Sequence, residues 1–337
     1  MVKKFNVLII GLGSIGQRHL RNINKIFPKT TFFAYRKKFK TPSLNNLNKV
    51  VSYNLKKKFK INYLKDLKNL YKFKIHAAFI CSPSRHHIKE AIEITKQKIH
   101  VFIEKPLGSS LRGVAKLKKI INKNNVNSMI GYQMRFNPMI KYLKKIINSK
   151  QNGKINQVSI HHGESIKNFH TYEDYRNLYA SKKQLGGGVV LTQIHEIDYF
   201  LYLFSDYKIE KFKSFAKKNS NLEINVEDTL SSIFLLKKNK ENLICNINLN
   251  CYETPTKRSI ILVYENKRIE ADFIKKKIIF YYKNRTKIKF FKFSRNEIFI
   301  NEIKYFFSHV IKNQKIPKTL NIENGIKTLK FALELKK

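Results

Sequence analysis

Several residue types are scarce or absent in this 337-residue sequence, beginning with tryptophan, of which there is none. The three cysteines, Cys81, Cys245 and Cys251, are an odd number without the spacing of metal ligands, which excludes a disulfide framework and a cysteine-based metal site. No apolar run approaches the roughly 18 residues that a membrane span requires. The N-terminus leads directly into a strand-like stretch and leaves no room for a signal peptide. We therefore expect a cytoplasmic protein with no membrane partner.

Acidic residues are also few: 23 Asp and Glu face 68 Lys and Arg, a formal net charge of +45. Such a balance is typical of nucleic-acid-binding proteins, and charge alone keeps that function open as an alternative. However, the lysines are spread over the whole length, without a basic tail or a single stripe. We therefore expect a solvated basic surface and no specific nucleic-acid partner. The positive field favours anionic ligands such as phosphorylated cofactors and nucleotide sugars.

Strands and helices alternate in the first part of the chain, which predicts a doubly wound parallel sheet in a domain of residues 1–130. The expected strands are 7–10, 31–35, 77–81, 100–103 and 128–130, with helices at 15–23, 85–96 and 111–122.

The pattern changes after Gly131, where successive strands lack intervening helices. This predicts an α+β domain of residues 131–337, built on a largely antiparallel open sheet. The sequence leaves open whether the last helix of this domain packs on the first domain instead. The expected strands are 157–161, 229–236, 242–251, 258–264, 267–273 and 287–293. The expected helices are 138–147, 172–183, 193–204, 296–311 and 322–335.

A glycine motif, Gly11-Leu12-Gly13-Ser14-Ile15-Gly16, lies between the first strand and the first helix. In this context the three glycines supply a tight turn, close backbone approach to a pyrophosphate and close helix packing. The helix N-terminus offers free N–H groups to the phosphates. The motif therefore predicts a nicotinamide dinucleotide cofactor, contacted by Gly11, Gly13, Ser14, Ile15 and Gly16.

The end of the second strand discriminates between NAD and NADP, because a carboxylate there binds the ribose 2′-hydroxyl of NAD. The strand ends Tyr35-Arg36-Lys37-Lys38, without a carboxylate. Arg36 suits a 2′-phosphate and predicts NADP, with NAD as the alternative. The other interpretation is that these are three more solvated basic residues.

Four further segments follow in order: Ser82-Pro83-Ser84-Arg85-His86-His87, Glu104-Lys105-Pro106, Gly131-Tyr132-Gln133-Met134-Arg135-Phe136, and Gly186-Gly187-Gly188 with Thr192, His195 and Asp198 behind it. Together with the glycine motif they resemble the Gfo/Idh/MocA oxidoreductases, the family of glucose–fructose oxidoreductase and inositol dehydrogenase. The resemblance covers essentially the whole chain.

The resemblance implies an N-terminal Rossmann domain, then a domain whose open sheet commonly mediates oligomerisation, as a dimer or tetramer. It implies hydride transfer between a nicotinamide and a carbinol or keto carbon of a sugar, cyclitol or nucleotide sugar. Lys105 then lies beside the nicotinamide ribose and the reacting oxygen, with Glu104 shaping the ribose pocket and a cis Lys105–Pro106 bond aiming the lysine. Three more cofactor contacts are expected, from Ser82, Ser84 and His87.

Oxidising a secondary alcohol requires a base for the hydroxyl proton, and His195 titrates in the right range. Lys105 stabilises the developing alkoxide. Asp198, one turn beyond His195, is expected to be structural. Many relatives have an Asp one turn before the histidine, where this chain has Leu191 and Thr192. That departure keeps open a non-catalytic NAD(P)-binding regulatory or scaffold protein.

Substrate contacts are expected from Arg135, Tyr175, Arg176, Thr192 and His195. The segment Tyr172-Glu173-Asp174-Tyr175-Arg176 resembles the substrate-facing segment of relatives in surface-polysaccharide and unusual-sugar pathways, and Arg176 suits an acidic or phosphate group. The alternative is an ordinary polar helix start. No metal is expected, because the spacing of five histidines fits no zinc pattern. These are His86, His87, His161, His162 and His170.

Overall fold

The structure is a computed structural model that describes residues 4–36 and 41–337. It divides into two compact units. The first contains residues 1–133, 184–186 and 295–329, and the second contains 134–183, 187–294 and 330–337. The sequence analysis placed the border after residue 130, assigned residues 131–337 to the second domain and left open that the last helix packs back on the first domain. In the structure, residues 295–329 belong to the first unit.

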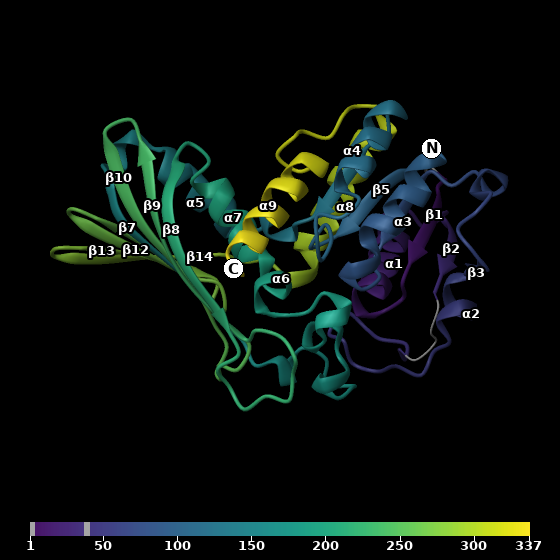
Figure 1. Ribbon diagram of the computed structural model, residues 1–337, viewed down its shortest axis with the longest axis horizontal. Helices are drawn as coiled ribbons and strands as arrows, with labels where there is room; N and C mark the ends of the chain where they lie inside the picture. The colour runs from purple at the N-terminus through teal and green to yellow at the C-terminus, as the bar shows by residue number, and fades with distance from the viewer. Residues whose placement is uncertain (1–3, 37–40) are drawn as a thin grey trace. The chain divides into compact units, whose positions relative to one another are not determined.

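The first unit is built on a parallel sheet, visible in purple and blue in Figure 1. Its described strands have the order β3-β2-β1-β4-β5-β6. They are β1 (Asn6–Ile10), β2 (Thr31–Tyr35), β3 (Asn62–Tyr63), β4 (Ala77–Ile80), β5 (His100–Glu104) and β6 (Ser128–Gly131). The helices between them are α1 (Ser14–Ile26), α2 (Leu55–Phe59), α3 (Ser84–Lys96) and α4 (Val114–Lys123). The strand order reverses between β1 and β4, the place where doubly wound folds bind their ligands. The predicted Rossmann sheet is confirmed.

Two C-terminal helices complete the core of the first unit, α8 (Arg295–Ile311) and α9 (Ile322–Glu334), of which residues up to 329 belong here. On α8, Phe306 and Phe307 are fully buried. The Phe307 ring lies 4.9 Å from that of Phe5, and the Phe306 ring lies 5.7 Å from that of Phe102. These aromatic contacts explain why α8 belongs with the first unit despite its late place in the sequence.

The second unit contains a larger, largely antiparallel sheet, shown in green in Figure 1. Its described strands have the order β14-β13-β12-β11-β7-β10-β9-β8, and only the β7–β10 pair among them is parallel. They are β7 (Ile155–Gly163), β8 (Lys208–Lys217), β9 (Thr229–Lys238), β10 (Glu241–Asn250), β11 (Lys257–Tyr264), β12 (Lys267–Asp272), β13 (Lys277–Tyr282) and β14 (Arg285–Phe290). Its helices are α5 (Pro138–Asn148), α6 (Val189–Thr192) and α7 (Ile194–Leu203). This confirms the predicted α+β class.

The two faces of this sheet differ in burial. Phe234 on β9 is fully buried and its ring lies 5.0 Å from that of Phe200 on α7. The opposite face leaves large apolar side chains in solvent, among them Phe215, Ile233 and Ile244. Alternation along the strands therefore produces one packed face and one face open to solvent in the single chain.

One expectation for the second unit is wrong. Residues 172–183 do not form an α-helix but successive 3₁₀ turns at Tyr175–Asn177, Tyr179–Ser181 and Lys183–Leu185. Side chains compete for the backbone there, because Asp174 accepts the Arg176 N–H and the Ser181 hydroxyl donates to the Tyr175 carbonyl. The expected strand at 287–293 corresponds to β14 (Arg285–Phe290). Its neighbour β13 and the lysine-rich edge strand β8 were not predicted.

Within residues 4–36 and 41–337, no helix combines the length and apolar character needed to cross a bilayer.

Candidate functional site

The glycine loop between β1 and α1 has the geometry that its motif predicts. Gly11 has φ of +87° and its N–H bonds the Tyr35 carbonyl at 2.9 Å, at the end of β2. A Cβ on Gly16 would lie 2.0 Å from the Gly11 carbonyl oxygen, so helix and loop approach too closely for any side chain. A Cβ on Gly13 would meet no heavy atom of the described residues within 4 Å. The loop therefore has no room for a side chain at Gly11 or Gly16, whereas the space next to Gly13 is free of described residues. This arrangement fits the close approach of a pyrophosphate group to the backbone.

The charge around this loop also fits a dinucleotide. Residues 14–26, which form α1, include no Asp or Glu, so nothing acidic opposes the positive end of the helix dipole. No acidic residue occurs in the sequence between Gly16 and Asp66. Arg36, directly after β2, is half-buried, whereas Lys37 and Lys38 lie outside the described residues. The position that carries a carboxylate in NAD-specific domains is thus occupied by a cation.

His87 joins two of the predicted cofactor segments. Its Nδ1 lies 2.8 Å from the Pro106 carbonyl oxygen and its Nε2 lies 2.7 Å from the Ser82 carbonyl oxygen. Burial lowers the pKa of His87, so the neutral ring donates to one of these carbonyls at a time. The ring therefore braces the loop after β4 against the loop after β5, and direct contact of His87 with the cofactor stays a prediction.

Ser82 and Ser84, the other predicted cofactor contacts here, already have partners. The Ser82 hydroxyl donates to Glu90 at 2.5 Å. Ser84 is buried and lies within hydrogen-bond distance of the Leu185 and Gly186 carbonyl oxygens. Gly186 has φ of +83°, and a Cβ there would lie 2.3 Å from the Ser84 hydroxyl. Ser84 therefore holds the segment 184–186 on the first unit.

Glu104 and Lys105 lie at the carboxyl end of β5. Glu104 is buried and its Oε1 accepts a hydrogen bond from His19 Nε2 at 2.6 Å. Its Oε2 accepts the Lys105 N–H at 3.2 Å, and the Lys105–Pro106 bond is cis, as expected. The sequence did not identify His19, because its place on the buried face of α1 made it one more member of the helical pattern. Its spacing from the glycines, one turn into α1, was the available signal.

In the second unit, Thr192 ends α6 and His195 lies in the first turn of α7, both buried. Neighbouring atoms approach the preceding glycines too closely for a side chain at either position. A Cβ on Gly187 would lie 2.4 Å from the Ala180 carbonyl oxygen, and one on Gly188 would lie 2.2 Å from the Glu227 carboxylate. The glycine run thus permits the chain to enter α6 tightly against its neighbours, and this fixes where Thr192 and His195 lie.

Arg135 and Asp198 form a buried bidentate ion pair. Arg135 Nε lies 2.5 Å from one carboxylate oxygen of Asp198 and Nη2 lies 2.9 Å from the other. The guanidinium also lies over the Tyr202 ring, at 4.2 Å from its centroid. Asp198 therefore has the structural role expected for it. The structure commits the Arg135 side chain to this pair, and its contact with substrate stays a prediction.

Arg176 and Tyr175 lie at the surface of the second unit. Arg176 Nη2 lies 2.6 Å from Asp174 and Nη1 lies 3.3 Å from Glu223, which raises the pKa of Arg176 further. The Tyr175 hydroxyl accepts the Glu223 N–H at 3.3 Å. These contacts order the segment, and its role toward substrate stays a prediction. Among the described residues, no group of three His, Cys, Asp or Glu side chains is arranged to hold a metal ion.

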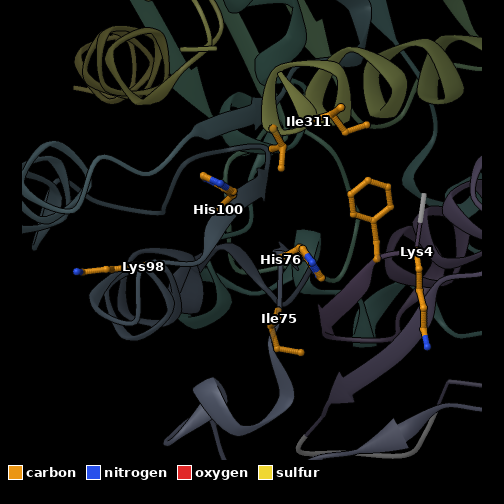
Figure 2. Close-up of a pocket in the computed structure, with 8 residues that line it drawn as sticks. Lys4, Ile75, His76, Lys98, His100 and Ile311 are labelled. Atoms are coloured by element: carbon orange, nitrogen blue, oxygen red, sulfur yellow. The ribbon is translucent and has the colours of Figure 1, made fainter. Parts of the chain in front are cut away.

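A pocket of about 470 Å³ lies at the other end of the parallel strands (Figure 2). Its lining includes His76, just before β4, and His100, at the start of β5, whereas the glycine loop and Glu104 lie at the carboxyl ends. Figure 2 shows the Lys4 and Lys98 side chains extending away from the two histidines, toward opposite sides. None of the predicted site residues lines this pocket, so it is separate from the candidate cofactor site.

Residues 5–132 match the family described as "Oxidoreductase family, NAD-binding Rossmann fold", GFO_IDH_MocA. An uncharacterized oxidoreductase of Bacillus subtilis, YrbE, is 31% identical over 159 residues, covering 46% of this chain and 42% of YrbE. The chain thus spans about half the length, or less, of the curated relatives first matched.

Solved structures extend the likeness to the whole chain. UDP-N-acetylglucosamine 3-dehydrogenase GnnA from Acidithiobacillus ferrooxidans has a TM-score of 0.76 at 14% identity, covering 99% of this chain and 97% of that one. The WlbA dehydrogenase from Bordetella pertussis, in complex with NADH and UDP-GlcNAcA, has a TM-score of 0.74 at 17% identity, covering 99% and 95%. Residues 5–132 therefore match this family of NAD-binding oxidoreductases, and the fold of the chain as a whole is similar to that of these solved dehydrogenases.

Proposed function

We propose that the protein is an NAD(P)-dependent oxidoreductase that transfers hydride between a nicotinamide and the CH–OH or C=O carbon of a sugar, cyclitol or nucleotide sugar. The observation that carries the proposal is the glycine loop, closed at Gly11 and Gly16 and open at Gly13. The reactive lysine, Lys105, follows β5 at the same carboxyl edge of the sheet.

The bound nicotinamide supplies or accepts the hydride. In the oxidation direction, His195 takes the hydroxyl proton while the carbonyl forms, and it returns that proton in reduction. Lys105 stabilises the negative charge that develops on the oxygen. Thr192 replaces the carboxylate frequent in relatives and hydrogen-bonds a substrate hydroxyl, so His195 carries the base role without a neighbouring acid at that position.

For the cofactor, we propose NADP in preference to NAD, with Arg36 gripping the 2′-phosphate. The absence of any acidic residue between Gly16 and Asp66 supports this, since nothing in that stretch offers a carboxylate to a ribose 2′-hydroxyl. The neighbours crystallised with NADH keep NAD as the alternative.

For the substrate, we propose a nucleotide sugar first, because GnnA is a UDP-N-acetylglucosamine 3-dehydrogenase and the WlbA structure contains UDP-GlcNAcA. Tyr175 and Arg176 would then contact the sugar and an anionic group. We also propose a cytoplasmic homo-oligomer that buries the open face of the second sheet, where Ile233 and Ile244 are exposed.

The test is the binding of NADPH and NADH, measured by fluorescence, for the wild type and Arg36→Ala. Tight NADPH binding by the wild type that Arg36→Ala loses supports NADP as the cofactor. Preference of the wild type for NADH would show that Arg36 does not bind a 2′-phosphate. Turnover is then measured with UDP-N-acetylglucosamine, its uronate and myo-inositol. Cofactor binding without turnover on any carbinol substrate would favour the second candidate, a non-catalytic NAD(P)-binding protein, which Leu191-Thr192 in place of the usual acid already suggests.

A further inference from the structure

A buried charged cluster lies between helix α7 and the sheet of the second unit. Glu196 on α7 is 0% exposed, and its Oε1 lies 2.7 Å from Arg258 Nη2 and 2.9 Å from His162 Nδ1. His162 and Arg258 come from β7 and β11, where they are direct cross-strand partners. Their side chains are only 9% and 17% exposed. Glu164 lies at the edge of the cluster, 3.6 Å from His162 Nε2.

The cluster fixes α7 on a different side from the Arg135–Asp198 pair. Residues two apart on a helix point to opposite sides, so Glu196 faces the sheet while Asp198 faces Arg135. Both carboxylates are fully buried and both are held by a guanidinium. Two such attachments from opposite sides determine the rotation of a helix about its own axis. His195 lies next to Glu196 in the sequence and one turn before Asp198.

The energetic cost of rearranging this cluster is high. Removing one partner of a buried ion pair is strongly destabilising, because the other charge remains buried without compensation. An apolar contact between helix and sheet would tolerate a small rotation of α7, but a rotation that moves Glu196 away from the Arg258 guanidinium, 2.7 Å from it, would leave two opposite charges buried and separated. The observation that remains to be explained is why a helix with Ile194, Ile197 and Phe200 already buried also needs a charged anchor.

We propose that Glu196, held by Arg258 and His162, is the positioning residue that sets the orientation of the His195 ring. The proposal rests on the proposed function in giving His195 a proton-transfer role, but it concerns the order of the ring itself. Proton transfer requires the ring nitrogen within hydrogen-bond reach of the reacting oxygen, so a rotation of α7 costs rate without changing cofactor affinity.

The experiment is NMR of the His195 ring in protein carrying ¹³C-labelled histidine, with its signal assigned by His195→Asn. The variants are Glu196→Gln and Arg258→Met. Loss of orientation predicts that the single His195 signal splits or broadens in both. A purely electrostatic influence predicts one sharp signal in each variant, with the titration midpoint moved down when the anion is lost and up when the cation is lost. That second result would overturn the proposal.

A matched control separates orientation from general instability. Ile269 on β12 is fully buried and apolar, and Ile269→Ala removes packing without touching a charge. At equal loss of melting temperature, this variant keeps one sharp His195 signal. If Glu196→Gln does not fold, Arg258→Lys keeps the cation but loses the planar fork, and the same splitting is expected. A sharp, unshifted His195 signal in every folded variant also rejects the proposal.

The catalytic readout is kept separate from this one. Where the wild type turns over a nucleotide sugar, Glu196→Gln should lower kcat about tenfold with the cofactor Kd unchanged, equivalent to about 1.4 kcal/mol. A wild type without turnover would remove the proposed function while the NMR result still decides the positioning proposal.

Discussion

The His19 ring donates to Glu104 at 2.6 Å, with both side chains shielded from solvent, and so joins the helix of the glycine loop to the segment that carries Lys105. The ring lies among Phe79, Phe102 and Phe299, with centroid distances of 5.3, 5.1 and 6.2 Å. These rings shield His19 from water, and the Glu104 carboxylate accepts hydrogen bonds from the His19 ring and from the Lys105 N–H. The hydrogen bond thus connects two predicted cofactor segments, the glycine loop with α1 and the Glu104-Lys105-Pro106 segment.

We therefore predict that His19→Ala weakens NADPH binding about tenfold, equivalent to about 1.4 kcal/mol. The variant leaves Glu104 buried beside a cavity, so unfolding free energy should also fall, by about 3–5 kcal/mol. Fluorescence titration and urea denaturation measure the two effects. Ile23→Ala, one turn further along the buried face of α1, is the control: it should lose stability by about 2–5 kcal/mol and keep cofactor affinity. Equal affinity of both variants for NADPH would contradict the coupling.

The second prediction concerns pH and His162. Burial and the charge of Arg258 work against a charge on His162, but Glu196 and Glu164 together outweigh them, so the pKa of His162 is raised. Burial also works against the Glu196 carboxylate, but Arg258 and His162 hold its pKa at about 2. A raised folded-state pKa gives stability that is complete below the unfolded-state pKa of about 6.5 and is lost as pH rises through the folded-state value. The wild type should therefore lose more unfolding free energy between pH 6 and 9 than His162→Gln does.

Urea denaturation across that range measures the difference between the two proteins. Glu196 stays ionised throughout, so it contributes no slope of its own there. Parallel curves for wild type and His162→Gln would show that His162 does not gain charge stabilisation from the cluster.

The third prediction tests whether Lys105 and His195 act on one substrate. Loss of the proton-transfer group in His195→Asn should lower kcat by about 10²–10⁴. Lys105→Met should lower it by about 10²–10³, because a positioned charge at the reacting oxygen is lost. In the double variant the two losses should combine to less than their product, as for residues that act as a unit. Fully multiplicative losses would assign them to separate steps.

The fourth prediction concerns the open face of the second sheet. Ile233 and Ile244 are 52% and 40% exposed there, on neighbouring strands. If this face joins two copies, Ile233→Lys with Ile244→Lys should reduce the mass measured by light scattering to that of the 39.9 kDa chain. Leu47→Lys replaces a side chain that is 77% exposed in the first unit and should leave the mass unchanged. A wild type that is already monomeric would exclude the oligomer.

Much of the first unit was predictable because its strands are uninterrupted apolar runs and its glycine loop has a defined geometry. The errors have local causes. The stretch around Asp174 and Ser181 has helix-like spacing, but its side chains bond the backbone and prevent an α-helix. Strand β8 is an edge strand with exposed lysines, and these obscure the alternation of apolar and polar residues by which a strand is recognised.

Parts of the candidate site were beyond the reach of periodicity. The motifs indicated Lys105, Glu104 and His195, whereas their supporting residues come from distant segments. His19 and Glu104 are 85 positions apart, and Arg135 and Asp198 are 63 apart. A buried polar residue at an apolar position of a helix is the only trace that such a pair leaves in one sequence.

The return of residues 295–329 to the first unit also bears on how the protein is made. A ribosome that has released residues 1–133 has synthesised the described strands of the parallel sheet but not Phe306 and Phe307, whose rings contact Phe79 and Phe102 on those strands. The N–H of Ile130 donates to the carbonyl of Leu320, so this hydrogen bond forms only after Leu320 has been synthesised. The nascent cofactor domain must therefore remain incomplete, with apolar surface exposed, until nearly the whole chain has emerged, and chaperone binding should be strongest during that interval.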